Sequence, residues 1–119
     1  DAGDAKRIAI QRLNANGTPF IEVGMGVLVN DDKLGGIIRV VCSTTPTRTA
    51  AAPHISYATD DGGLNQYTTN IQTPELNALN AALAVIRWKQ HAGIYQNIRE
   101  AIYTGYSIAS GEIVTKGIT

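Results

Sequence analysis

The feature that most constrains how this 119-residue chain folds is one long helical pattern at residues 74–91. Thr73-Pro74-Glu75 supplies a helix cap, a proline for the first helical position and an acid for the first turn, and Gly93 is a stop signal. Apolar residues at helical spacing cover most of the circumference: Leu76, Leu79, Leu83 and Ile86 form one stripe, widened by Ala78, Ala82, Val85 and Trp88. The polar stripe is narrow and consists of Asn77, Asn80, Arg87 and His91. Because such a helix is apolar on more than one side, we expect a contact helix whose second side meets another subunit or domain.

Composition narrows the classes of partner. Ten basic and ten acidic residues give no net charge, whereas nucleic-acid binders carry a basic excess. Charged residues make up 17% of the chain, against about 25% in an average soluble domain, so we expect part of the surface to be covered by another surface. No apolar run reaches the roughly 18 residues that a membrane helix needs. The single cysteine, Cys42, excludes an internal disulfide and a cysteine-only zinc site, and favours a cytoplasmic location.

The first 24 residues indicate half of a βαβ crossover. A helical pattern follows Asp4, a candidate N-cap, and ends at Asn16-Gly17. The apolar run at residues 20–24 comes next and is typical of a buried parallel strand. We therefore expect a preceding strand that ends at Asp1 and lies outside this chain.

Two antiparallel hairpins are predicted. Residues 27–29 and 37–42 are β-rich runs joined by a polar, glycine-ended loop, and residues 103–108 and 112–116 are joined by a turn at Ser110-Gly111. The predicted fold class is therefore α/β: a mixed sheet with one parallel strand followed by antiparallel hairpins, packed with two main helices. Residues 1–119 are predicted to form a single partial domain.

Residues 43–73 carry no convincing period and contain the turn sequence of residues 60–63. A loop of this length in a compact domain is either a functional flap or disordered. We favour a flap, because Tyr57 and Tyr67 provide rings that can anchor it to a surface.

Candidate polar residues gather at the start of the chain. Asp1, at the carboxyl end of a parallel strand, would lie at the sheet edge where α/β folds bind ligands, and its carboxylate can hold Mg²⁺ or a hydroxyl group. The alternative is a solvated aspartate at a chain terminus. Lys6 and Arg7 could face a phosphate or be ordinary surface charges.

Cys42 is a candidate nucleophile, but no lysine or histidine lies within several residues of it, and a packed thiol is the competing interpretation. His54 and His91 are too far apart in sequence to argue for zinc. From the residues alone, no catalytic constellation is complete.

Four segments together resemble the carboxyl-terminal half of a ThiF-type adenylating domain, the superfamily of ThiF, MoeB, HesA and the ubiquitin-activating enzymes. They are Asp1-x-x-Asp4-Ala-Lys-Arg7, Gly17-Thr-Pro19-Phe-Ile-Glu-Val-Gly24-Met-Gly26, Leu34-Gly35-Gly36-Ile-Ile-Arg39-Val40 and residues 70–89. The last of these resembles bacterial ThiF-family proteins in particular. The resemblance covers nearly the whole chain.

The resemblance implies a Rossmann-like ThiF domain in a homodimeric, ATP-dependent adenylyltransferase. Such an enzyme activates the carboxyl terminus of a ubiquitin-like or sulfur-carrier protein. Asp1 matches the family's aspartate that binds Mg²⁺ and ATP, and Arg7 matches its arginine, one residue further along than in MoeB-like sequences. Residues 43–73 take the place of the crossover loop under which the carrier tail threads. Gly24-Met25-Gly26 offers bare backbone for that tail.

The chain also departs from the family. The glycine-rich nucleotide loop and the phosphate-binding arginine and lysine would lie upstream of Asp1, so ATP and Mg²⁺ are expected only in the full-length protein and the isolated chain is expected to be inactive. The two CxxC pairs that hold zinc in many members are missing, so no zinc is expected, and Cys42 is the only candidate acceptor thiol. The alternative function is a non-catalytic dimerisation or interaction module that uses the helix at residues 74–91.

Overall fold

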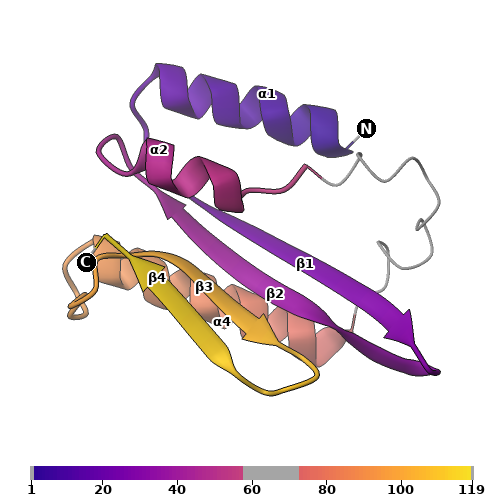
Figure 1. Cartoon of the computed structure of the whole chain (residues 1–119). Helices are drawn as coiled ribbons and strands as arrows, with labels where there is room; N and C mark the ends of the chain where they lie inside the picture. The colour runs from indigo at the N-terminus through magenta and orange to yellow at the C-terminus, as the bar shows by residue number, and fades with distance from the viewer. Residues whose placement is uncertain (1, 58–72, 119) are drawn as a thin grey trace.

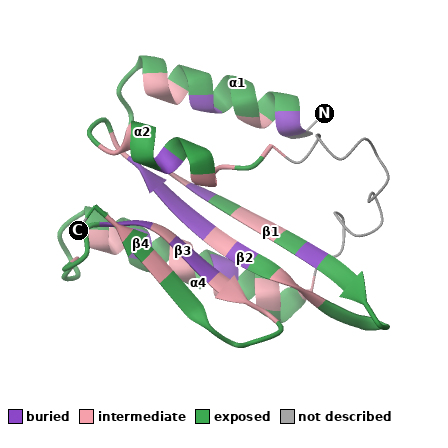
Figure 2. Ribbon diagram, in the orientation of Figure 1, coloured by how far each residue is buried: buried purple, intermediate pink, exposed green. Residues whose placement is uncertain are grey.

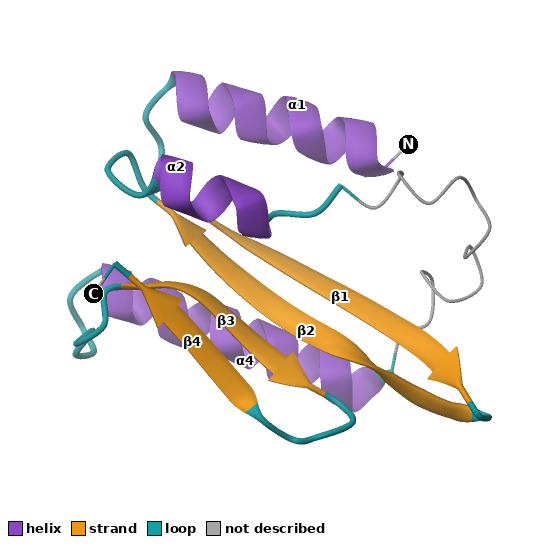
Figure 3. Cartoon of the chain, viewed as in Figure 1, coloured by secondary structure: helices purple, strands orange, loops and turns teal. Residues whose placement is uncertain are grey.

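The computed structural model describes residues 2–57 and 73–118. The elements in chain order are α1 (Ala2–Ala15), β1 (Phe20–Asn30), β2 (Lys33–Ser43), α2 (Arg48–Ala51), the 3-10 turn η1 (Ala52–His54), α4 (Pro74–His91), β3 (Ala101–Ser107) and β4 (Ile113–Gly117) (Figures 1 and 3). The class is therefore α/β. Asp1, one of the predicted site residues, lies outside the described residues.

The four strands form one sheet in the order β1-β2-β3-β4, and each neighbouring pair is antiparallel. β1 and β2 pair from Phe20 with Ser43 to Asn30 with Lys33. They are joined by Asp31 and Asp32 at φ 52° and 63°, the left-handed conformation of a two-residue type I′ turn. The first predicted hairpin is confirmed, and so is the second, whose turn holds Gly111 at φ 73°.

The predicted parallel strand is not supported in the described residues. β1 pairs with β2 alone, and that pair is antiparallel. The prediction ended a short strand at Gly24 and started a hairpin arm at Val27. Neither Gly24 nor Gly26 has a positive φ, so both continue the ladder and the two runs form one 11-residue strand.

Helices cover both faces of the sheet. Arg87 of α4 bonds Thr104 of β3, whose paired residue is Val40, whereas Ala51 of α2 packs on the next residue of β2, Val41. Successive side chains of a strand point to opposite faces, so α4 lies on one face and α2 on the other. Figure 1 shows α4 behind the sheet, with α1 and α2 together on the other side.

The most buried residues lie mainly along β2 (Figure 2). The largest fully buried side chains are Ile38, Val40 and Val41 of β2 and Val27 of β1. On the α2 side, Val41, Ala51 and Ile102 form a cluster against which Ile55 and Tyr103 pack. Burying such aliphatic side chains contributes roughly 1.5–3 kcal/mol each, and β2 supplies most of them, so it holds the domain together.

One predicted helix is confirmed at both ends, and the other starts earlier than predicted. The predicted helix at residues 74–91 is confirmed at both ends. The first helix begins at Ala2, so Asp4 lies in its first turn and is not the N-cap; Gly17, at φ 67°, follows the helix as predicted. Residues 48–54, predicted as part of a loop, form α2 and η1, and Tyr67 lies outside the described residues.

α4 faces the sheet with side chains of its polar stripe. Its buried residues are Asn80 and Arg87, flanked by the half-buried Leu76, Leu79 and Leu83. Val85, Ile86 and Trp88 are 53%, 45% and 54% exposed. We call these three residues the α4 outer patch. The helix therefore presents an uncovered apolar side.

Candidate functional site

A buried carboxylate connects α1 to the sheet. Glu22 of β1 is almost fully buried, and its Oε2 accepts hydrogen bonds from Lys6 Nζ of α1 and from Arg39 Nη2 of β2, the latter at 2.8 Å. Lys6 Nζ also donates to the carbonyl oxygen of Ser56 at 2.7 Å. The cluster therefore fixes α1, the β1–β2 hairpin and the segment after η1 in one arrangement.

Arg7 lies on the exposed side of this cluster. Its guanidinium carbon is 4.1 Å from the centroid of the Tyr57 ring, and Lys6 Nζ is 5.8 Å from the same centroid. Cation–π contacts of this kind are worth about 0.5–1 kcal/mol at exposed sites. Arg7 is thus positioned beside residue 57, where the described part of the predicted crossover loop ends.

Gly24, Met25 and Gly26 lie in the middle of β1, and the two glycines differ. A Cβ at Gly24 would lie 2.2 Å from Arg39 Nη2, so the Arg39 guanidinium covers that position. The carbonyl oxygen of Gly24 also accepts a hydrogen bond from Asn80 Nδ2 of α4 at 3.2 Å. At Gly26 no other segment of the described residues comes within 4 Å of the corresponding Cβ position. Of these two glycines, only Gly26 is open.

β1 is an edge strand of the described sheet. In a two-residue hairpin the residues flanking the turn, here Asn30 and Lys33, form a hydrogen-bonded pair, and the pairs then alternate along the ladder. Val23, Met25 and Val27 consequently direct their backbone N–H and C=O groups away from β2. Such groups are a template for another extended chain.

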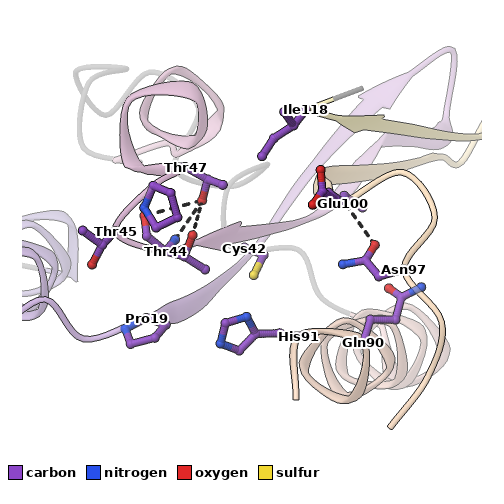
Figure 4. Close-up of a pocket in the computed structure, with 12 residues that line it drawn as sticks. Pro19, Cys42, Thr44, Thr45, Thr47, Gln90, His91, Asn97, Glu100 and Ile118 are labelled. Atoms are coloured by element: carbon purple, nitrogen blue, oxygen red, sulfur yellow. Dashed lines mark hydrogen bonds between the residues drawn. The ribbon is translucent and has the colours of Figure 1, made fainter. Parts of the chain in front are cut away.

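Cys42 lines a cavity of about 460 Å³ on the α4 side. His91, at the end of α4, and Glu100, before β3, line the same cavity (Figure 4). Cys42 and His91 also line a smaller cavity of about 190 Å³ with Trp88. Burial raises the pKa of the Cys42 thiol, and the positive charge of Arg87 partly opposes that rise. The protonated, packed thiol is therefore the form present near neutral pH.

The sequence did not predict that Cys42 and His91 line a common cavity. The two residues are far apart along the chain, and they come together only because α4 packs on β2. The sequence also did not predict the ion pair between Glu22 and Arg39. The hairpin register was the one available signal, because Arg39 pairs with Gly24, which lies two residues from Glu22 on the same face of β1.

The two histidines do not meet. The His54 ring stacks on Tyr103, with 4.7 Å between centroids, on the α2 side. Within residues 2–57 and 73–118, no group of three or more His, Cys, Asp or Glu side chains is arranged to hold a metal ion. Over the same ranges, no helix has both the length and the apolar character needed to cross a membrane.

Comparisons of the chain with protein-family models, curated proteins and solved structures find no match.

Proposed function

We propose that this chain is the carrier-binding half of a ThiF-like, Rossmann-like, ATP-dependent adenylyltransferase of the cytoplasm. In the full-length protein, the edge of β1 would bind the extended carboxyl-terminal tail of a ubiquitin-like or sulfur-carrier protein. The observation that carries the proposal is the edge position of β1 in the described sheet beside Gly26, over which no side chain of residues 2–57 and 73–118 lies. The isolated chain is proposed to be inactive.

The physical basis is strand addition. A tail lying along β1 would pair with the outward N–H and C=O groups of Val23, Met25 and Val27, which give affinity without requiring a particular tail sequence. Because Gly26 has no side chain, a side chain of the bound tail could lie over β1 at this position. Lys6 holds the segment at Ser56 near α1, so this part of the predicted crossover loop at residues 43–73 lies on the same side of the sheet as Glu22.

Residues of α1 would meet the nucleotide. When bound with Mg²⁺, ATP supplies the adenylyl group that activates the carrier carboxylate, with release of pyrophosphate. Of the two cations in the first half of α1, Lys6 is already paired with Glu22, whereas Arg7 is exposed and contacts only the Tyr57 ring among the described residues. Arg7 therefore suits a phosphate better than Lys6. The metal role of Asp1 rests on the resemblance.

The adenylation step is tested by ATP–pyrophosphate exchange with the full-length protein and its Asp1→Asn variant. We expect exchange to fall by at least about tenfold, because the variant removes one charge from the proposed metal ligand set. Undiminished exchange would remove Asp1 from the proposal.

The tail site is tested separately with Gly26→Val, which puts a side chain into the open position. Gly35→Val is the matched control, because Gly35 lies in β2 of the same hairpin and also has no atom within 4 Å of its Cβ position. We expect Gly26→Val to weaken carrier binding, measured by titration calorimetry, and Gly35→Val to leave it unchanged. Equal affinities for the two variants would contradict the proposed tail site.

A second candidate function is a non-catalytic module that pairs subunits through α4. The observation that favours it is the α4 outer patch, whose side chains are about half exposed although they are large and apolar. Val85→Glu should shift a dimer toward the monomer in light scattering. Ile8→Glu is the control, because Ile8 of α1 is 52% exposed and Val85 is 53% exposed. A wild-type protein that is monomeric at high concentration would exclude this pairing.

A further inference from the structure

The α4 side of the sheet buries an arginine without a carboxylate. Arg87 is 8% exposed. Its Nη1 donates to Gln90 Oε1 at 2.6 Å, its Nη2 donates to Thr104 Oγ1, and its Nε is buried without an acceptor. No carboxylate in the described residues forms an ion pair with it. Burial lowers the pKa of Arg87, and the nearby Cys42 partly opposes that fall.

Arg87 lines a cavity of about 370 Å³ between the end of α4 and the β3–β4 hairpin. Arg99 is a second arginine in the lining, which also includes Gln90, Gln96 and Asn97. The Gln90 side chain already accepts from Arg87 and donates to the carbonyl oxygen of Gln96. The lining contains no aspartate or glutamate; the nearby Glu100 lines the adjoining cavity that holds Cys42.

We propose that this cavity binds an oxyanion, a phosphate or carboxylate group, between the guanidiniums of Arg87 and Arg99. Arginine is the residue best suited to bind such a group, and the lining supplies two arginines, Arg87 and Arg99. The cavity is larger than one phosphate, so the group can belong to a larger molecule. The site contains neither β1 nor α1, and it is independent of the proposed adenylation.

The helix dipole acts against the anion here, because α4 ends at His91 and a helix carboxyl terminus carries about half a negative charge. That charge favours the Arg87 cation in the last turns. Arg87 and Arg99 together bring two positive charges to the residues that line the cavity.

Thermal unfolding in sodium phosphate, sodium acetate and sodium chloride at equal ionic strength tests the proposal. At a concentration about tenfold above the dissociation constant, a bound oxyanion should raise the Tm by about 5 °C over chloride. A larger rise in phosphate identifies a phosphate site, and a larger rise in acetate identifies a carboxylate site. Equal Tm values in all three salts would overturn the proposal.

Two variants place the effect in this cavity. Arg99→Gln removes one guanidinium from an exposed residue and should abolish most of the rise. Asn97→Asp puts a carboxylate in the lining while keeping the oxygen that accepts the Ala101 N–H at 3.0 Å. It should raise the Tm in chloride and remove the response to phosphate or acetate.

Arg12→Gln is the matched control, because Arg12 is an exposed arginine on α1. Its salt response should equal that of the wild type. A rise that persists in both Arg99→Gln and Asn97→Asp would place the anion elsewhere and overturn the proposal. Neither variant alters the buried Arg87, so the test does not depend on whether an Arg87 variant folds.

Discussion

Each face of the sheet holds an arginine, partly buried Arg39 on one face and buried Arg87 on the other, and the two differ in what balances their charge. On the α1 side, Arg39 pairs with the carboxylate of Glu22, which Lys6 also contacts. On the α4 side, Arg87 bonds only a hydroxyl group and an amide oxygen. Both guanidiniums retain an unpartnered Nε, so the hydrogen-bond deficit is similar and the difference is one of charge.

The comparison separates a face whose two cations share a buried carboxylate from a face whose buried arginine has no carboxylate partner among the described residues. Removing the carboxylate from the first face leaves two cations uncompensated, and a buried or partly buried charge without a partner is costly. Removing the charge from the second face leaves no counter-charge behind. The same kind of substitution should therefore have opposite consequences on the two faces.

The largest effect is expected for Glu22→Gln. It leaves Arg39 and Lys6 buried or partly buried without a carboxylate, and we expect the free energy of unfolding to fall by about 3 kcal/mol. Denaturant unfolding measures the change. Glu112→Gln is the control, because Glu112 is exposed in the turn before β4 and should change stability by less than about 0.5 kcal/mol. Equal stabilities of the two variants would show that the cluster is not a stabilising unit.

Gly24→Ala should disturb the same cluster less strongly. The new Cβ would lie within 2.5 Å of all three terminal guanidinium atoms of Arg39, so that side chain must move away from Glu22. We expect a loss of about 1–2 kcal/mol. Gly26→Ala meets open space in the same strand and should stabilise by up to about 0.5 kcal/mol, because alanine restricts the unfolded chain. A denaturant series with both variants gives the sign of each effect.

The parts of the fold that local chemistry determines were predictable from the sequence. The Thr73-Pro74-Glu75 start fixed the first residue of α4, and glycines with positive φ ended α1 and turned the second hairpin. The first hairpin was predicted too, but its first strand was predicted to start at Val27, whereas β1 starts at Phe20. Gly24 and Gly26 were interpreted as a break, but both keep an extended backbone and pair with β2. The Arg39 side chain fills the space beside Gly24, whereas the space beside Gly26 is open.

Most of the candidate sites could not be predicted, because they depend on which face of each element packs inward. The apolar stripe of α4 suggested which side is buried, yet Asn80 and Arg87 are its buried residues, since Gly24 and Thr104 offer them acceptors. The hydrophobic periodicity of a helix depends only on the helix's own residues, so it contains no information about hydrogen-bond acceptors on a distant strand. For the same reason no pattern placed His91 beside Cys42.

Arg87→Met should change the free energy of unfolding much less than Glu22→Gln does, although both variants remove one buried charge. Methionine fills much of the same volume, removes an uncompensated buried cation and leaves no charge unpaired. We expect stability in chloride buffer to change by less than about 1 kcal/mol, or to rise. Arg39→Met, by contrast, should cost about 2 kcal/mol, because Glu22 then keeps only Lys6. A large loss for Arg87→Met in chloride would mean that Thr104 and Gln90 already compensate its charge.

The smallest effect concerns Cys42, whose thiol responds to the Arg87 charge. Burial raises the Cys42 pKa above the unfolded value of about 8.5. Stability from this group is therefore fully present below pH of about 8.5 and is lost as the pH rises through the folded-state pKa. Cys42→Ala should flatten that alkaline decline in denaturant unfolding, while the wild type becomes progressively less stable above pH of about 8.5.

The pKa of the Cys42 thiol can be used to test whether the buried Arg87 side chain is charged. Arg87 lowers the Cys42 pKa, so Arg87→Met should raise that pKa further, followed by the ultraviolet absorbance of the thiolate as the pH increases. Arg39→Met is the matched control: it removes a guanidinium from the other face, and Arg39 is not among the groups that shift Cys42. Equal titration curves for wild type and Arg87→Met would mean that the cation is already neutralised. In that case Arg87 would have a partner that offsets its charge, as Arg39 has in Glu22.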